Sequence, residues 1–146
     1  MTTVIFHGRA GQPVPRLAEL LAAAALRDGR FSQTWRVFSI TPVRGPIAAV
    51  TRVSDRYIRE RAPMTVKADW AVVLDPSLIP HLGAQPGVHV LCAPPPPGVA
   101  LPAGWQRLEV PAFSSAPEVL SAWAVAVAGA TGLVSTEAAA AAAGAA

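Results

Sequence analysis

Short runs of consecutive apolar residues constrain the fold of this chain more than any other feature of its sequence. Residues 70–74 read Trp-Ala-Val-Val-Leu and residues 88–92 read Val-His-Val-Leu-Cys, without the alternation that marks a strand with one solvated face. Strands of this kind are buried on both faces, which is typical of a parallel sheet covered by helices. Further strands are predicted at residues 2–6, 31–38, 47–53 and 107–110.

Helical segments alternate with these strands. Leucines and alanines recur at helical spacing over residues 16–26, and an Asp-Gly pair follows that is typical of a helix end. Residues 114–118 resemble a helix start, and the alanine-rich helix that follows is predicted to break near Gly129 or Gly132 before it resumes. This alternation predicts an α/β fold, with a mostly parallel sheet and helices on both of its faces.

The chain is predicted to form a single domain. Its 146 residues contain no internal repeat and suffice for a hydrophobic core. Residues 1–137 are assigned to the domain, and residues 138–146, which are nearly all alanine, to a fraying helical tail. The run of prolines at 94–97 predicts an extended connector on the surface.

Charge is scarce in this sequence. Hydrophobic residues make up 52% of the chain and Asp, Glu, Lys and Arg 14%, against about 25% charged residues in an average soluble domain. Disorder is excluded, because disordered chains combine low hydrophobicity with high net charge. The most apolar stretch, residues 119–136, consists mainly of small residues, so that burial in protein is predicted rather than a membrane span. The chain opens directly with a predicted strand and not with a signal peptide, which favours a cytoplasmic location.

The charges that are present are unevenly distributed. Through Lys67 the sequence holds eleven Lys or Arg against four Asp or Glu, and beyond it one, Arg107, against five. Nucleic acid is not predicted as a partner, because the arginines are dispersed and no set of stacking aromatic residues accompanies them. A first half that faces a protein partner is the other explanation of this split.

Residues for catalysis or metal binding do not form a recognisable pattern. The one cysteine, Cys92, excludes an internal disulfide and a four-cysteine iron–sulfur site, and at the end of a buried strand it is predicted to be inert. The histidines at 7, 81 and 89 lack metal-ligand spacing, so that no metal site is predicted. Ser77 and Ser114 lack the context of a nucleophile elbow. No catalytic residue is assigned.

The strongest candidate for a binding site is the loop Gly8-Arg9-Ala10-Gly11-Gln12-Pro13 between the first strand and the first helix. Ligands of such sheets bind beyond the carboxyl ends of the strands, and a helix N-terminus after a glycine-rich loop favours an anion. The loop matches neither the dinucleotide-binding fingerprint nor a P-loop, and its spacing alone favours a tight strand-to-helix turn over an anion site. Asp75, at the same predicted edge, is interpreted as the cap of the next helix.

Five segments, in order along nearly the whole chain, carry a family resemblance. Residues 4–12 read Val-Ile-Phe-His-Gly-Arg-Ala-Gly-Gln, and Thr-Gly-Leu-Val-Ser-Thr-Glu closes the pattern at residues 131–137. Between them lie an arginine–glycine loop at 38–46, a strand and turn at 52–59, and a central strand at 68–78. The sequence thereby resembles the γ subunit, or γ domain, of the 2-oxoacid:ferredoxin oxidoreductases, which include the pyruvate and 2-ketoglutarate synthases.

The resemblance implies an accessory subunit with a Rossmann-like fold. In that family, thiamine diphosphate and iron–sulfur clusters are held by other parts of the complex, and the γ part helps to form the coenzyme A region. The implied partners are the α and β thiamine-binding subunits and a ferredoxin-like subunit, and no cofactor resides on this chain. By this resemblance, a loop that binds coenzyme A or another anion is expected at Gly8, Arg9, Gly11 and Gln12. The resemblance also assigns an interface to Ile40, Pro42, Arg44 and Gly45.

Departures from the family pattern point away from ligand binding. The family loop usually reads His-Gly-Arg-Gly-Gly-Gln-Gly, whereas Ala10 and Pro13 occupy two of those glycines here. Ile40 and Pro42 stand where related sequences have glycine and glutamate, and Leu120 stands where an asparagine is usual. We interpret these changes as drift toward a scaffold. Two alternatives stay open: a γ-like scaffold of another assembly, and a small protein that binds an anion or nucleotide.

Overall fold

The computed structural model describes residues 1–37, 45–61, 67–83 and 85–145. Its centre is a six-stranded sheet in the order β2-β3-β1-β4-β5-β6. The strands are β1 (Thr2–Arg9), β2 (Phe31–Val37), β3 (Pro46–Ser54), β4 (Trp70–Val73), β5 (His89–Cys92) and β6 (Gln106–Arg107). The helices are α1 (Val14–Arg27), the 3-10 turn η1 (Pro76–Leu78), α2 (Ile79–Leu82), α3 (Pro117–Thr131) and α4 (Thr136–Gly144).

The sheet is mixed, with one strand that opposes the rest. The pairs β1–β4, β4–β5 and β5–β6 are parallel, and β3 is antiparallel to both of its neighbours, β1 and β2. Only eight residues separate β2 from β3 in the sequence, fewer than the dozen or so that a parallel crossover needs, which agrees with the antiparallel pairing of these two strands. The predicted α/β class with a mostly parallel sheet is confirmed, and β3 is the exception within it.

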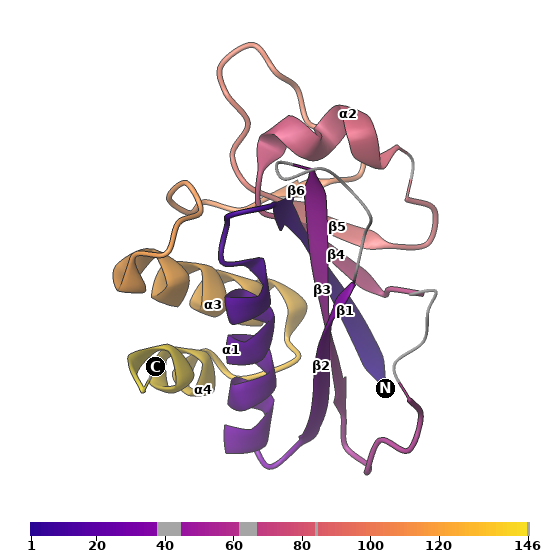
Figure 1. The fold of residues 1–146 in the computed structure, drawn as a ribbon, viewed down its shortest axis with the longest axis vertical. Helices are drawn as coiled ribbons and strands as arrows, with labels where there is room; N and C mark the ends of the chain where they lie inside the picture. The colour runs from indigo at the N-terminus through magenta and orange to yellow at the C-terminus, as the bar shows by residue number, and fades with distance from the viewer. Residues whose placement is uncertain (38–44, 62–66, 84, 146) are drawn as a thin grey trace.

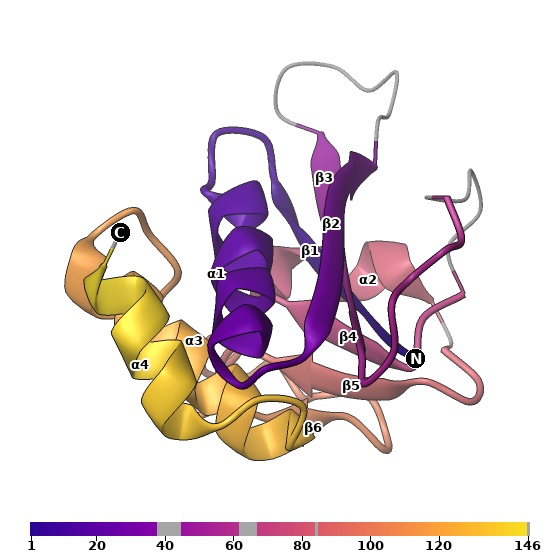
Figure 2. The ribbon, with the colours of Figure 1, turned by 90° about the horizontal axis from the view of Figure 1, so that it is seen from below.

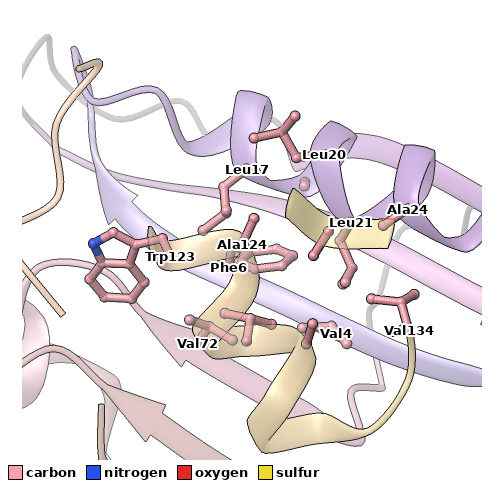
Figure 3. Packing of buried hydrophobic residues seen from close by; sticks show 14 of the residues in the cluster. Val4, Phe6, Leu17, Leu20, Leu21, Ala24, Val72, Trp123, Ala124 and Val134 are labelled. Atoms are coloured by element: carbon pink, nitrogen blue, oxygen red, sulfur yellow. The ribbon is translucent and has the colours of Figure 1, made fainter. Parts of the chain in front are cut away.

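The longer helices cover one face of this sheet. Figures 1 and 2 show α1, α3 and α4 on the same side, with α1 lying along β1 and β3. The predicted spacing in α1 is realised, because its apolar side chains point into the largest core cluster. Figure 3 shows how Leu17 and Leu21 from α1 meet Phe6 of β1 and the fully buried Trp123 of α3. Trp123 is thus a core residue, held by a hydrogen bond from its Nε1 to the carbonyl of Pro111 (2.9 Å).

The other face is covered over β4 and β5 by the short helical segment η1–α2. Leu78 and Ile79 pack there against Val73, Val90 and Cys92 in a second, smaller core cluster. The prediction of helices on both faces is therefore confirmed, with unequal coverage. The Asp75 carboxylate accepts a hydrogen bond from the amide of Ser77 (2.9 Å), as expected of a helix cap.

The alanine-rich run at the end of the sequence differs from its expected state. Residues 136–144 form α4, which packs on α1 and α3 and buries Ala138, Ala139 and Ala142. The hydroxyl of Ser135 caps the helix by accepting from the amide of Ala138 (3.1 Å). The sequence predicts a fraying helical tail because the run is of low complexity and terminal, but the small alanine side chains let helices approach closely and bury methyl groups.

Two further boundaries also differ from the sequence expectation. β6 ends at Arg107, although a strand was predicted through Val110. α3 begins at Pro117 after Ala116, and the hydroxyl of Ser114 caps a preceding turn by accepting from the amide of Ala116 (3.3 Å) rather than capping the helix. Among the described residues no helix has both the length and the apolar character needed to cross a membrane.

Candidate functional site at the carboxyl edge of the sheet

The carboxyl ends of β1, β4 and β5 meet at one edge, as the parallel pairing requires. A cavity of about 220 Å³ lies at this edge. It is bordered by the loop after β1, the turn after β4, the segment after β5 and the segment before α3, and its lining residues are Gln12, Leu74, Asp75, Pro76, Ala93, Pro94, Val110, Ala112 and Phe113. The edge predicted to bind ligands is therefore hollowed, but its walls are mainly apolar.

Gly8 is required by packing at this edge. It is part of β1, and a Cβ atom built on it would lie 2.4 Å from Cγ2 of Val14 and 2.9 Å from Oε1 of Gln12. Gly11 has a φ of +91°, a backbone conformation that favours glycine, and its Cβ would meet no atom within 4 Å. The first glycine thus permits close packing of the helix start, and the second permits the turn.

The backbone amides of Arg9, Ala10, Gln12 and Val14 are used within the chain. Arg9 donates to the side chain of Gln12 (2.8 Å), and the amides of Gln12 and Val14 donate to the carbonyls of Arg9 and Gln12 (3.0 and 2.8 Å). Pro13 and Pro15 have no amide to offer. A phosphate cradle needs several free amides aimed at one point. This loop does not provide them.

The side chains of the loop are likewise engaged. The guanidinium Nε of Arg9 donates to the hydroxyl of Ser77 (2.7 Å), and the amide of the Gln12 side chain donates to the Asp75 carboxylate (3.1 Å). These two contacts tie the loop after β1 to the turn after β4. These contacts join four side chains, Arg9, Gln12, Asp75 and Ser77, into one polar network. The sequence did not predict this network, because the two residues after β1 and the two after β4 lie more than sixty residues apart.

The second predicted loop reaches the first at one described point. The carbonyl of Gly45 accepts a hydrogen bond from the amide of Ala10 (3.0 Å), so that Gly45 lies beside the Gly8–Gln12 loop. Ile40, Pro42 and Arg44 lie outside the described residues. Phe113, in the apolar wall of the cavity, is not among the predicted site residues, and its ring packs edge-on against Trp123 (ring centroids 5.5 Å apart).

Two other candidate residues do not line this cavity. Cys92 is buried, and burial raises the pKa of its thiol to about 11, so that the thiolate that would react is scarce at neutral pH. His7 lines a separate cavity of about 630 Å³, and burial lowers its pKa. Among the described residues no group of three or more His, Cys, Asp or Glu is placed to hold a metal ion.

The sheet order and its hollowed edge define an α/β domain of the class whose ligands usually bind at the carboxyl ends of the strands. Over residues 3–145 the chain matches the family model described as pyruvate ferredoxin/flavodoxin oxidoreductase. The chain belongs to this family. The resemblance to its γ subunits is confirmed.

Curated relatives have the matching names. The chain is 40% identical over 79 residues to the pyruvate synthase subunit PorC of Methanothermobacter marburgensis, an alignment that covers 54% of this chain and 44% of that protein. It is 35% identical over 88 residues to the common subunit gamma of the pyruvate/ketoisovalerate oxidoreductases of Thermococcus kodakarensis, covering 60% and 47%. The matched region thus spans somewhat less than half the length of these relatives.

Solved structures share the fold. The pyruvate oxidoreductase subunit PORC of Thermotoga maritima superposes with a TM-score of 0.63 at 21% identity, covering 94% of this chain and 80% of that one. The gamma subunit of a keto/oxoacid ferredoxin oxidoreductase from Geobacter sulfurreducens gives 0.65 at 23% identity, covering 97% and 82%. At these identities the superpositions establish the fold of the chain.

Proposed function

We propose that this chain is an accessory γ-type subunit of a multi-subunit, thiamine-dependent 2-oxoacid:acceptor oxidoreductase. Such a complex decarboxylates a 2-oxoacid oxidatively and forms an acyl-CoA. In this proposal the subunit supports the assembly and performs no catalytic step alone. Family membership and the names of the relatives support the assignment.

The observation that carries the accessory role is the closed state of the Gly8–Gln12 loop. The amides of Arg9, Ala10 and Gln12 and its two polar side chains are engaged within the chain, which supports a role in holding the sheet edge together rather than in receiving a phosphate. Coenzyme A therefore does not fit this loop as a phosphate cradle. A buried lone cysteine likewise does not fit the ligand set of an iron–sulfur cluster.

In this assignment thiamine diphosphate, iron–sulfur clusters and coenzyme A belong to the partner subunits. The chain binds α and β thiamine-binding subunits and a ferredoxin-like subunit. The Gly8–Gln12 loop, together with Gly45 beside it, faces one of them. Residues 40–44, which directly precede Gly45 in the sequence, are proposed to belong to that interface.

Affinity purification of the tagged chain from its native host tests the assignment. We expect thiamine-binding and ferredoxin-like subunits in the eluate. The complex should reduce an acceptor with a 2-oxoacid and coenzyme A, whereas the isolated chain should not. Recovery of an unrelated assembly would support the alternative of a recruited scaffold, and recovery of a well-behaved monomer without partners would contradict both.

Titration calorimetry of the isolated chain with coenzyme A tests the proposal that the Gly8–Gln12 loop does not bind this cofactor. We expect no binding to the wild type. The double substitution A10G/P13G, which returns two glycines to the loop, is the informative comparison because it restores an amide and removes a methyl group. Binding to the wild type that is lost on R9A would overturn the accessory reading of this loop.

A further inference from the structure

Arg52 is a buried cation whose counter-charge is missing from the chain. We propose that it receives a carboxylate of a partner subunit, and that the sheet face around it is a docking surface for an acidic protein segment. The proposal rests on the proposed function in one respect only, namely that the chain is a subunit of an assembly. It concerns β3, away from the carboxyl edge described above.

Arg52 is held firmly beneath the surface. The residue is 7% exposed, and its guanidinium carbon lies 4.8 Å from the centroid of the Trp35 ring on the neighbouring strand β2. Its Nη1 donates to Oε1 of Gln33 (3.1 Å) and to the carbonyl of Arg61 (3.3 Å). These partners fix the plane of the guanidinium but carry no negative charge.

One edge of that guanidinium is left without acceptors. Nε is buried and has no hydrogen-bond partner, and no described group accepts from Nη2. Nε and Nη2 are the adjacent donors that a carboxylate binds side-on with two parallel hydrogen bonds. The free edge therefore has the geometry of a receptor for a planar, two-oxygen anion.

No acidic residue of this chain supplies that anion. All nine Asp and Glu lie among the described residues, and residues 38–44 and 62–66 contain none. The ion pairs in the described chain are Arg16–Glu19, Arg30–Asp55 and Arg107–Glu109. Buried charges in proteins are normally paired, because an unpaired one forfeits its hydration without compensation. The missing partner must come from outside the chain.

The surroundings of Arg52 fit a protein segment of negative charge. Arg56, Arg59 and Arg61 follow on the next turn of chain, and all three are exposed. Beside them Phe31 and Tyr57, 43% and 72% exposed, form an edge-to-face pair with ring centroids 6.0 Å apart. Arginine with exposed aromatic residues is the composition of an interface core, and β2 is the edge strand of the sheet. A free small anion would not use this aromatic pair.

The substitution R52M tests the proposal through two readouts of opposite sign. In the tagged complex from the native host, we expect R52M to weaken the affinity for the partner roughly 30-fold or more, seen as release of the partner at lower salt. In the isolated full chain, we expect R52M to melt at or above the wild-type temperature, because it removes an uncompensated buried charge.

Two controls sharpen this comparison. R52K keeps the charge but lacks the two-donor edge, so its affinity for the partner in the complex should lie between those of wild type and R52M. R27M removes an exposed arginine at the end of α1 and should leave partner affinity unchanged. Mass spectrometry identifies the retained partner separately. If that partner is not an oxidoreductase subunit, the proposed function fails while the R52M comparison still decides this inference.

Several outcomes would overturn the inference. One is partner affinity of R52M within threefold of wild type. Another is an isolated R52M chain that melts clearly below wild type, since Arg52 would then stabilise the chain internally. A third is wild-type melting that rises with inorganic phosphate at constant ionic strength, in an Arg52-dependent way, because the site would then serve a free anion. Absence of any retained partner would count equally against it.

Discussion

At the scale of single residues, the roles of Gly8 and Arg52 follow from their neighbours in the fold and not from the sequence around them. Gly8 looks like a ligand-binding glycine in sequence, yet Val14 and Gln12 occupy the space where its side chain would be. Arg52 begins a segment that resembles the family's strand and turn but was not singled out as a site residue, yet burial without a carboxylate distinguishes it among the charges of the described chain. In both cases the neighbours across the fold decide the role.

Gly8→Ala should destabilise the chain by about 1–3 kcal/mol, because its methyl group would overlap the side chain of Val14 and force the start of α1 to move. Gly129→Ala is the matched control. A Cβ there lies 3.8 Å from Thr136, an ordinary contact, and alanine in place of glycine within α3 should stabilise by about 0.5–1 kcal/mol. Denaturant unfolding of both variants measures the difference, and equal effects would contradict the packing role of Gly8.

His7 should make the chain sensitive to mild acid. Burial lowers its pKa in the folded state, so that below its ordinary value of 6.5 the unfolded chain binds the proton more readily than the folded one. The stability attributable to a neutral His7 is therefore present above about pH 6.5 and lost as the pH falls. Unfolding free energies between pH 7.5 and 5.5 should decline in the wild type and decline less in H7Q. If the unfolding free energies of wild type and H7Q fell equally with pH, the pH dependence would belong to groups other than His7.

At the scale of elements, α4 shows how a low-complexity segment gains a fixed place. Nothing in a run of alanines predicts which methyl groups face the core. The register is set at its start, where the Asp28 carboxylate after α1 accepts from the amide and the hydroxyl of Ser135 (2.6 and 2.8 Å). These hydrogen bonds lower the pKa of Asp28. Their contribution to stability is therefore present at pH values above the ordinary pKa of a carboxyl and is lost in strong acid.

Ala139→Glu and Ala140→Glu test the placement of α4, because they introduce the same side chain one residue apart. Ala139 is 1% exposed in the core cluster, whereas Ala140 faces solvent. We expect A139E to destabilise by about 2–4 kcal/mol through overpacking and burial of a carboxylate, and A140E by less than about 0.5 kcal/mol. Thermal or denaturant unfolding with equal losses for the pair would show that α4 does not pack as described.

At the scale of the whole molecule, the sheet joins two core clusters into one body. β4 and β5 contribute Val72 and Leu91 to the cluster under the long helices and Val73 and Cys92 to the cluster under α2. Neither cluster is able to lose its packing while the strands between them stay paired. Only 14% of all residues are charged, which is consistent with a subunit whose surface is covered by neighbouring chains, as the proposed function requires.

We expect this shared sheet to give a single cooperative unfolding transition. Tryptophan fluorescence reports the surroundings of the four tryptophans, among them the fully buried Trp123 of α3, and far-ultraviolet circular dichroism reports all helices, α4 included. The two signals should have coincident midpoints in urea. An early loss of helical signal while the tryptophan fluorescence stays native would instead separate α4 from the folded body, as a fraying tail requires.

The sequence alone determined the α/β class, the order of strands and helices, and the family, because apolar runs, helical spacing and short motifs are local properties of the chain. Tertiary structure alone decided the reversal of β3, the burial of α4, the closed hydrogen bonding around Gly8–Gln12 and the unpaired state of Arg52. Each of these depends on residues far apart in sequence that the sheet brings together. A single sequence does not encode such pairings as a readable pattern.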